Sequence, residues 1–365
     1  MEKQNKKISK VLVLLMAVMM VFTMMPSMAF AAGNGNDVGL SEAENENVTV
    51  YVTISNQGAI PLGRDGTTGM IQVPISVPKT ATEVDVLKKA HELYSENGTE
   101  DYTMTSGWFT KFWGVETSNI GYFRNGAMVM SPTTVSSGDY IEGMIYGEYT
   151  KEKYTTFQTH EVTASAFSAI RMQLLGNVIL SSDYKSGMMM GGTADQPITT
   201  TTILVGDAGS CNIPYDDSKN YRTDGNGVVY LSFEDPGVYY IAPDTAASKN
   251  IPGTCKITVT EAESEENRIA TVNADKEALG FDQIKGSNTD AEAIVDNLCL
   301  TKSGNSGKTL ISWTSSDPAV INNEGTVTRP LFESGDKKVV LTANITYGDG
   351  VAATKEITVT VSKLP

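Results

Sequence analysis

The chain has 365 residues, of which 40% are hydrophobic, and its formal net charge at pH 7 is −15. Such an acidic balance argues against nucleic acid or an anionic membrane surface as a partner, because both are polyanions. The length predicts two or three domains, and the hydrophobic content argues against long disordered regions.

The amino terminus has the pattern of a secretory signal peptide. Four lysines lie within the first ten residues, an apolar run covers residues 11–22, and the small residues Ala29 and Ala31 precede a cleavage site. A membrane anchor is the alternative, but Pro26 and nearby polar residues interrupt the run before it reaches the roughly 20 residues of a spanning helix. We expect residues 1–31 to be cleaved. The mature protein is then secreted or associated with the cell surface, without membrane insertion.

A spacer and a first domain follow. Residues 32–47 are rich in Gly, Asn and Glu and predict a disordered spacer. The first domain is expected at residues 48–154, where alternating residues at 48–54 and an apolar segment at 70–77 predict strands. Thr80 or Thr82 is a suitable N-cap for a helix that Asn97 and Gly98 would end. Its apolar face is predicted to carry Val84, Leu87, Ala90, His91 and Tyr94.

Aromatic strands complete this domain. Residues 108–115 and 121–124 predict strands, Asn125-Gly126 predicts a tight hairpin turn, and residues 137–139 predict a turn into a strand at 140–146. One helix on a small mixed sheet is an α+β, β-grasp-like arrangement. The order of these elements, with the aromatic strand ending in Asn-Gly and the later Gly-Asp turn, resembles the bacterial domain related to the C-terminal domain of transcobalamin and intrinsic factor. The resemblance implies cobalamin as one ligand to consider, although the helical-barrel domain of the eukaryotic carriers is absent.

The second domain is expected at residues 155–262 as a β-sandwich. Strands are predicted at 157–162, which includes His160, and within 167–180, where a helix is the alternative. Further strands are predicted at residues 199–205, 227–233, 238–242 and 255–260. The Asp-Pro-Gly turn at 235–237 followed by an aromatic strand resembles the last hairpin of bacterial immunoglobulin-like sandwiches.

The third domain is expected at residues 263–365, after an acidic connector at 261–266. A helical patch is predicted at 290–298, followed by short strands with turn signals about every ten residues, which is typical of a sandwich. The segments 313–318 and 325–330 resemble the atrophied bacterial immunoglobulin-like domain. That resemblance implies a spacer or accessory module in a secreted Gram-positive protein. The overall expectation is a mainly β, multidomain chain, with one β-grasp-like domain followed by two immunoglobulin-like sandwiches.

Few residues are suited to catalysis or metal binding. The two histidines, His91 and His160, lack zinc-type spacing, and His91 is expected in the core rather than as a base. Neither a nucleophile elbow nor a phosphate loop is present. The acids at 216, 217 and 224 with the amide at 226 leave a calcium site open as a minority alternative. We expect no metal, no cofactor and no enzymatic activity.

The cysteines leave two alternatives open. Cys211 and Cys255 lie in one predicted domain, and exported proteins meet oxidising conditions, so a disulfide between them is one alternative. Two buried free thiols are the other. Cys299 lies in another domain and is expected to be a small buried side chain.

The aromatic residues of the first domain are the strongest candidates for a ligand site. Adjacent pairs such as Trp108 and Phe109 cannot both point inward on one regular strand, so one ring of each is exposed or covered by a neighbouring module. If a ligand binds, we expect the contacts to be Trp108, Trp113, Tyr122, Arg124 and Asn125. The methionine run at 188–190 is a less specific candidate.

Three functions remain as expectations. The first is a non-catalytic secreted or cell-surface binding or scaffold protein, whose partner is a glycan, a corrinoid or another surface protein. The second is a cobalamin- or corrinoid-binding protein, which rests only on the transcobalamin-like resemblance. The third is a secreted carbohydrate-active accessory protein or enzyme, which would need paired carboxylates on a rigid cleft, whereas the acids here fall mostly in turns and linkers.

Overall fold

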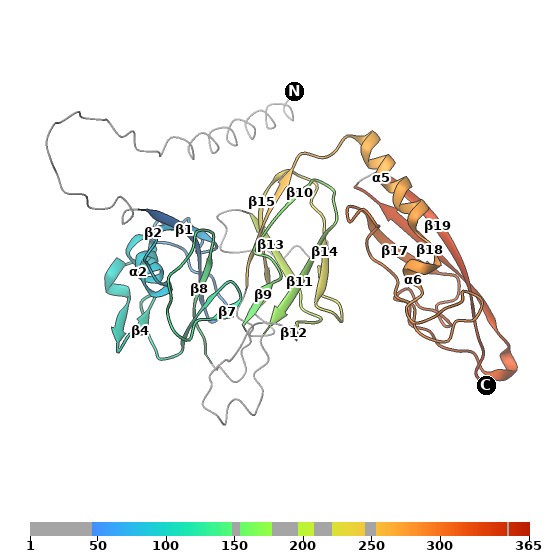
Figure 1. The fold of residues 1–365 in the computed structure, drawn as a ribbon, viewed down its shortest axis with the longest axis horizontal. Coiled ribbons are helices and arrows are strands. Elements are labelled where there is room, and N and C mark those ends of the chain that lie inside the picture. The colour runs from blue at the N-terminus through green and yellow to red at the C-terminus, as the bar shows by residue number, and fades with distance from the viewer. Residues whose placement is uncertain (1–45, 148–153, 177–195, 208–220, 245–252, 349) are drawn as a thin grey trace, which may run out of the picture. The chain divides into compact units, whose positions relative to one another are not determined.

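The computed structural model describes residues 46–147, 154–176, 196–207, 221–244, 253–348 and 350–365. The predicted signal peptide and nearly all of the predicted spacer lie outside these residues. The chain is mainly β, with several sheets in more than one domain, which confirms the predicted fold class (Figure 1). No helix in the described part is long and apolar enough to cross a membrane. The domain boundaries stay a prediction. Below, the first, second and third modules denote residues 48–154, 155–262 and 263–365.

The first module is a five-stranded sheet with one helix packed on it. The sheet order is β2-β1-β8-β6-β7, in which β1 and β8 are parallel and the other pairs are antiparallel. The strands are β1 (Asn47–Asn56), β2 (Val73–Pro78), β6 (Ile120–Arg124), β7 (Ala127–Met128) and β8 (Tyr140–Ile145). Helix α2 (Glu83–Tyr94) buries Val84, Leu87 and Ala90 in the same core as the sheet. This is the predicted β-grasp-like arrangement.

Helix α2 begins at the predicted cap. The Thr82 hydroxyl accepts a hydrogen bond from Asp85 N–H at 3.4 Å, and the Asp85 carboxylate accepts one from Thr82 N–H at 3.0 Å. Such a capping box satisfies two backbone donors that the helix leaves free. The helix ends at Tyr94, earlier than the predicted stop at Asn97 and Gly98. Ser95 takes an extended conformation there, and its hydroxyl donates to His91 O at 2.8 Å.

A second, three-stranded sheet carries Trp108, and Trp113 lies in one of its turns. It consists of β3 (Thr103–Thr105), β4 (Trp108–Phe112) and β5 (Val115–Glu116), all antiparallel, after the short 3₁₀ helix η2 (Gly98–Asp101). The single strand predicted over residues 108–115 is wrong. The chain reverses at Trp113 and Gly114, whose φ angles of 48° and 79° fit a hairpin turn with positive φ at both central residues.

Both faces of the larger sheet are covered. Its second face carries Phe123 and Met144, which form a separate buried cluster with Tyr146 and Tyr154. Tyr154 belongs to the segment that leads into the second module, and its ring stacks on Phe123 with centroids 3.6 Å apart. Two-sided burial explains why β6 and β8 are buried almost throughout rather than at alternate residues.

Polar contacts join the first and second modules beside this cluster. The Gln72 side chain donates from Nε2 to His160 O at 3.0 Å and to Thr254 O at 3.2 Å. The Thr53 hydroxyl accepts from Gln72 N–H at 3.0 Å and lies 3.4 Å from the Thr254 hydroxyl. The second module is therefore docked on the first through hydrogen bonds as well as rings.

The second module is a sandwich of two sheets around one core. One sheet has the order β10-β16-β15-β13, with β10 (Glu161–Ser165), β13 (Ile203–Asp207), β15 (Gly237–Pro243) and β16 (Cys255–Thr260). The other has the order β12-β11-β14, with β9 (Thr155–Phe157), β11 (Ile170–Gly176), β12 (Gln196–Pro197) and β14 (Val228–Leu231), where β9 also pairs with β11. The strand alternative for residues 167–180 is confirmed at 170–176. The strand predicted over 157–162 is wrong, because His160 lies in the connection between β9 and β10.

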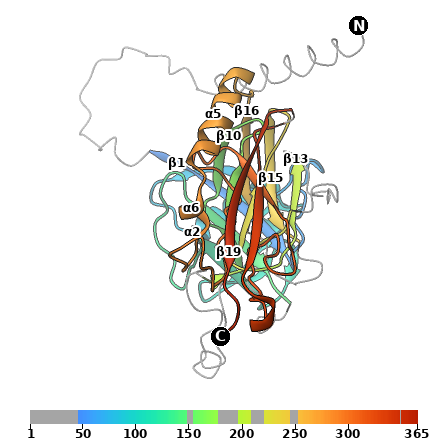
Figure 2. The same ribbon diagram turned by 90° about the vertical axis from the view of Figure 1, so that its right-hand side faces the viewer.

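The third module consists of a three-stranded sheet, β17 (Leu310–Ser315), β18 (Lys337–Thr346) and β19 (Ala352–Val361), with two helices, α5 (Glu265–Ala278) and α6 (Phe281–Ile284), and the 3₁₀ helix η3 (Phe332–Ser334). Helix α5 lies beside β18 and β19 (Figure 1, Figure 2). It begins inside the segment predicted to be an acidic connector. Ser264 caps it, and Glu265 and Glu266 in its first turn complement the helix dipole.

The helical patch predicted at residues 290–298 is wrong. The Asn288 side chain donates to Lys285 O and Asp296 O, both at 2.9 Å, and accepts from the backbone N–H groups of Val295 and Asp296. It thereby binds backbone groups that a helix would need. Ile294 instead pairs with the end of β19.

Candidate functional site

The structure distributes the five predicted ligand contacts over three surroundings. Trp108 and Tyr122 lie together, with ring centroids 5.9 Å apart. Trp113 packs on His91, with centroids 5.1 Å apart. Arg124 and Asn125 both contact Asp139 at the end of the larger sheet. The five residues therefore do not form one cluster, and their role in ligand binding stays a prediction.

Trp108 is the exposed member of the aromatic group. Its side chain is 46% exposed, whereas its neighbour Phe109 is 4% exposed, so one ring of this pair leaves the core as expected. Tyr122 beneath it is 2% exposed, and its buried hydroxyl has no hydrogen-bond partner among the described residues. Burial, and then the nearby Glu83 carboxylate, raise the pKa of Tyr122 to about 12. The Tyr122 hydroxyl is therefore neutral at pH 7, and its ring packs beneath that of Trp108.

His91 is a core residue, as predicted. Its ring is fully buried among Tyr102, Phe109, Phe112 and Trp113, with centroid distances between 4.6 and 5.8 Å. The imidazole Nε2 accepts from Trp113 N–H at 2.9 Å, so Nδ1 carries the proton and donates to Leu87 O at 2.7 Å. Burial lowers the pKa of His91. The neutral ring therefore holds the β4–β5 turn against α2.

Replacing His91 with Phe tests this structural role. His91→Phe keeps a ring in the aromatic cluster but removes both hydrogen bonds, leaving the partly buried Trp113 N–H without its acceptor. We expect a loss of about 1–3 kcal/mol in the free energy of unfolding, measured by urea titration. An unchanged stability would show that the two hydrogen bonds contribute nothing. Phe332→Ala, at a side chain that is 59% exposed in the third module, is the control.

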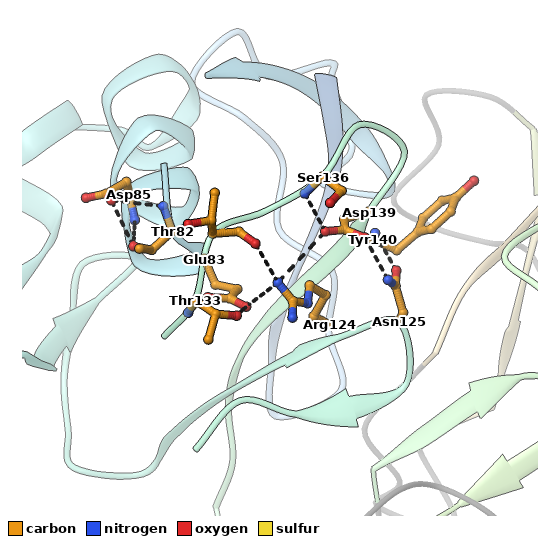
Figure 3. Close-up of polar contacts among 10 residues, drawn as sticks. Thr82, Glu83, Asp85, Arg124, Asn125, Thr133, Ser136, Asp139 and Tyr140 are labelled. Atoms are coloured by element: carbon orange, nitrogen blue, oxygen red, sulfur yellow. Dashed lines mark hydrogen bonds and ion pairs between the residues drawn. The ribbon is translucent and has the colours of Figure 1, made fainter. Parts of the chain in front are cut away.

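Arg124 pairs with a buried carboxylate (Figure 3). Its Nη1 lies 2.8 Å from Glu83 Oε1 and donates to Thr134 O at 3.1 Å. The Glu83 side chain is 1% exposed and also accepts from Thr133 N–H at 2.7 Å. The guanidinium therefore neutralises a carboxylate at the first turn of α2.

Asn125 holds the adjacent turn. Its Nδ2 donates to Asp139 Oδ1 at 2.8 Å, and its Oδ1 accepts from Tyr140 N–H at 2.9 Å. Asp139 also accepts from Ser136 N–H at 2.8 Å. Figure 3 shows the Tyr140 ring pointing away from Arg124. Arg124 and Asn125 thus stabilise the end of the sheet, while Tyr140 lines a groove.

This groove has a volume of about 480 Å³ and lies where the first two modules meet. It is lined by Asn125, Gly126, Gly138 and Tyr140 of the first module and by residues 156–161 and Leu175 of the second. The Tyr140 ring stacks on His160 with centroids 4.4 Å apart and on Tyr51 with centroids 5.2 Å apart. Sequence reasoning identified only Asn125 of this set, since the others meet through the docking of two modules.

Other predicted residues have structural roles or lie outside the described part. Cys255 is buried and forms no disulfide with another described residue, and burial raises the pKa of its thiol to about 12. Cys211 lies outside the described residues, so the disulfide stays a prediction. Cys299 is free and exposed, which contradicts its expected burial: its N–H donates to Ile284 O, but its side chain lies at the surface.

The alternative calcium site is only partly visible. The Asp224 carboxylate accepts from the backbone N–H groups of Asn226 and Val228, which closes a turn. Residues 216 and 217, and the methionines at 188–190, lie outside the described residues. Across the described ranges, no group of three or more His, Cys, Asp or Glu side chains is placed to hold a metal ion.

Comparison with known proteins supports the C-terminal expectation. Residues 272–364, about a quarter of the chain, match the family described as atrophied bacterial Ig domain. The match does not extend to the first module, so the transcobalamin-like resemblance stays a prediction. No curated protein matches the chain.

Similar solved structures include Drosophila N-cadherin EC1-4, at 11% identity and a TM-score of 0.19, covering 88% of this chain and 76% of that one. Mouse cadherin-23 EC22-24 is 10% identical with a TM-score of 0.16, covering 88% of this chain and 100% of that one. The N-terminal four Ig domains of Dscam1 isoform 6.9 are 10% identical with a TM-score of 0.22, covering 87% and 78%. Likeness at this level carries no argument about function.

Proposed function

We propose that this chain is a non-catalytic binding or scaffold protein that works outside the cytoplasm, and that its first module contacts the ligand through Trp108. The mainly β architecture and the match of residues 272–364 to an atrophied bacterial Ig domain fit a binding or scaffold role. The second and third modules then present the first module.

The exposed ring of Trp108 carries this proposal. Large aromatic rings are usually buried when they have no partner to contact, and an exposed indole can stack on a sugar or another flat ligand. The ring lies on a strand whose buried residues, Phe109 and Phe112, are fixed in the core with His91. A rigid support of this kind reduces the entropy lost when a ligand binds.

Replacing Trp108 tests the proposal. The chain from Ala32 would be screened on a glycan array and by titration with cobalamin, and its affinity for any ligand found would be compared with that of Trp108→Ala. We expect Trp108→Ala to bind at least about tenfold more weakly, because exposed tryptophans that become buried on binding are frequent hot spots. We expect its unfolding free energy to change by less than about 1 kcal/mol, because the ring is half exposed.

A matched control separates the first module from exposed aromatics in general. Phe332→Ala removes an exposed ring from the third module and should leave affinity unchanged. Equal affinity of Trp108→Ala and the unmodified chain would contradict the proposed contact. A lack of binding in both screens would leave a scaffold role, in which the modules contact another protein.

A further inference from the structure

The groove between the first two modules has walls that other contacts hold in place. The Asn125 side chain is fixed by Asp139 and by Tyr140 N–H. A Cβ built on Gly126 would lie 3.3 Å from Thr156 Cγ2, so this turn touches the second module closely. In the part of the lining that the second module supplies, His160 O accepts from Gln72 Nε2 at 3.0 Å and from Lys256 N–H at 2.9 Å. The groove is therefore formed before any ligand arrives, which favours binding.

The groove lining is polar and almost neutral. Burial, and then the nearby Glu161, raise the pKa of Tyr140 to about 12, and burial lowers the pKa of His160, so both are neutral at pH 7. Of the lining residues within the described ranges, Glu161 is the one carboxylate, and its Oε1 lies 3.0 Å from Lys256 Nζ. The remaining polar side chains are amides and hydroxyls, on Asn125, Gln158, Thr156 and Thr159.

This chemistry selects against charged ligands. Phosphate or sulfate groups need cationic side chains or free helix N-termini, and neither Lys nor Arg is among the described residues that line the groove. Amides, hydroxyls and a carboxylate beside aromatic rings are suited instead to ligands that both donate and accept hydrogen bonds from many hydroxyl groups. A volume of about 480 Å³ is within the range of small-molecule sites.

We propose that this groove binds an uncharged oligosaccharide, with Gln158 and Glu161 as hydrogen-bonding residues and Tyr140 and His160 as part of its wall. The site is separate from Trp108 and does not depend on it. Glu161 already accepts from Lys256 Nζ and, at 3.5 Å, from the Tyr140 hydroxyl, so its second lone pairs remain suited to sugar hydroxyls.

A comparison of neutral and acidic glycans tests the proposal. The chain from Ala32 would be titrated calorimetrically with pools of neutral oligosaccharides and of uronate-containing oligosaccharides. The variants are Gln158→Ala, Glu161→Gln and their combination. Glu116→Gln, an exposed carboxylate on β5 outside the groove, is the matched control. Circular dichroism and thermal melting would establish that each variant is folded.

We expect binding of neutral glycans in preference to acidic ones, and a decrease in affinity of about tenfold or more in the combined variant but not in Glu116→Gln. Because Trp108 lies outside the groove, the neutral-glycan binding that the combined variant removes should persist in Trp108→Ala, and any ligand bound through the Trp108 ring should still bind the combined variant. Three results would overturn the proposal: no glycan binding, equal binding of acidic glycans, or full affinity in the combined variant. Binding that is lost in Trp108→Ala but kept in the groove variants would support the proposed function while rejecting the groove.

Discussion

The free energy of unfolding should fall as the pH rises from about 6.5 to about 8, by up to about 1.4 kcal/mol per pH unit, because of Glu142. The Glu142 carboxyl is fully buried on the second face of the larger sheet, where burial raises its pKa from 4.5 to about 8. The Tyr154 hydroxyl donates to it and partly offsets that rise. The carboxyl is therefore neutral at pH 7 in the folded protein.

The sign of this pH dependence follows from how many protons the folded and unfolded chains bind. Above pH 4.5 the unfolded chain has lost the Glu142 proton, while the folded chain keeps it up to about pH 8. This contribution is fully present below pH 4.5 and is lost as the pH rises to about 8, above which the curve is flat. His91 and His160, with lowered pKa values, act in the opposite direction, but only below about pH 6.5. The window from about 6.5 to about 8 therefore isolates Glu142 from both histidines.

Two variants separate Glu142 from other causes. Glu142→Gln cannot ionise, so its stability should not change with pH in this window. Tyr154→Phe keeps the ring that stacks on Phe123 but removes the hydroxyl, so the pKa of Glu142 should rise further and the decline should extend above pH 8. Urea titrations followed by tryptophan fluorescence at several pH values measure the unfolding free energy of each variant. A flat profile in the unmodified chain, or the same slope in Glu142→Gln, would contradict the assignment. Glu116→Gln is the exposed carboxylate control.

Local signals predicted the parts of the fold that local physics decides. The alternation at residues 48–54, the capping pair of Thr82 and Asp85 and the turn at Asn125 and Gly126 each depend on a few neighbouring residues, and each is present in the structure. The alternation at residues 48–54 and the predicted aromatic strands did not indicate that the five-stranded sheet of the first module is buried on both faces. That burial comes from Tyr154, where the chain leads into the second module, and from Leu175 of the second module, and no local pattern describes it.

Helix α5 was not predicted from the sequence, for a different reason. Its hydrophobic pattern is weak, since Val272 is its buried apolar residue, and it is held instead by a buried carboxylate. Asp275 accepts from Ser306 N–H at 2.8 Å and from the hydroxyls of Ser306 and Thr309 at 2.7 and 2.6 Å. Such contacts join residues far apart in the chain, so periodicity could not predict them.

The candidate site was only partly predictable for a related reason. The rule that adjacent rings on a strand point to opposite faces correctly separated exposed Trp108 from buried Phe109. It could not anticipate that Trp113 lies in a turn, or that Tyr122 is covered. The groove combines residues 125–140 with residues 156–175, so only the docking of two modules reveals it.

Arg124→Ala should lower the free energy of unfolding by about 3 kcal/mol, because it leaves the Glu83 carboxylate buried without its cation. Among the described residues, Glu83 would then keep hydrogen bonds from Thr133 N–H and from the Thr133 hydroxyl, at 2.7 and 3.3 Å. The exposed pair of Lys88 and Asp85, 3.7 Å apart on α2, is the control: Lys88→Ala should change stability by less than about 1 kcal/mol.

A double variant shows whether the unpaired charge is the cause. Glu83→Gln in the Arg124→Ala background removes the buried charge, so part of the lost stability should return. Urea titration of the unmodified chain, the two single variants and the double variant measures this. If Arg124 instead served only a ligand, Arg124→Ala would unfold at the same urea concentration as the unmodified chain and bind ligand more weakly. The two roles therefore differ in a measurement that needs no knowledge of the ligand. Because the guanidinium is already within 2.8 Å of a carboxylate that is 1% exposed, we expect the loss of stability.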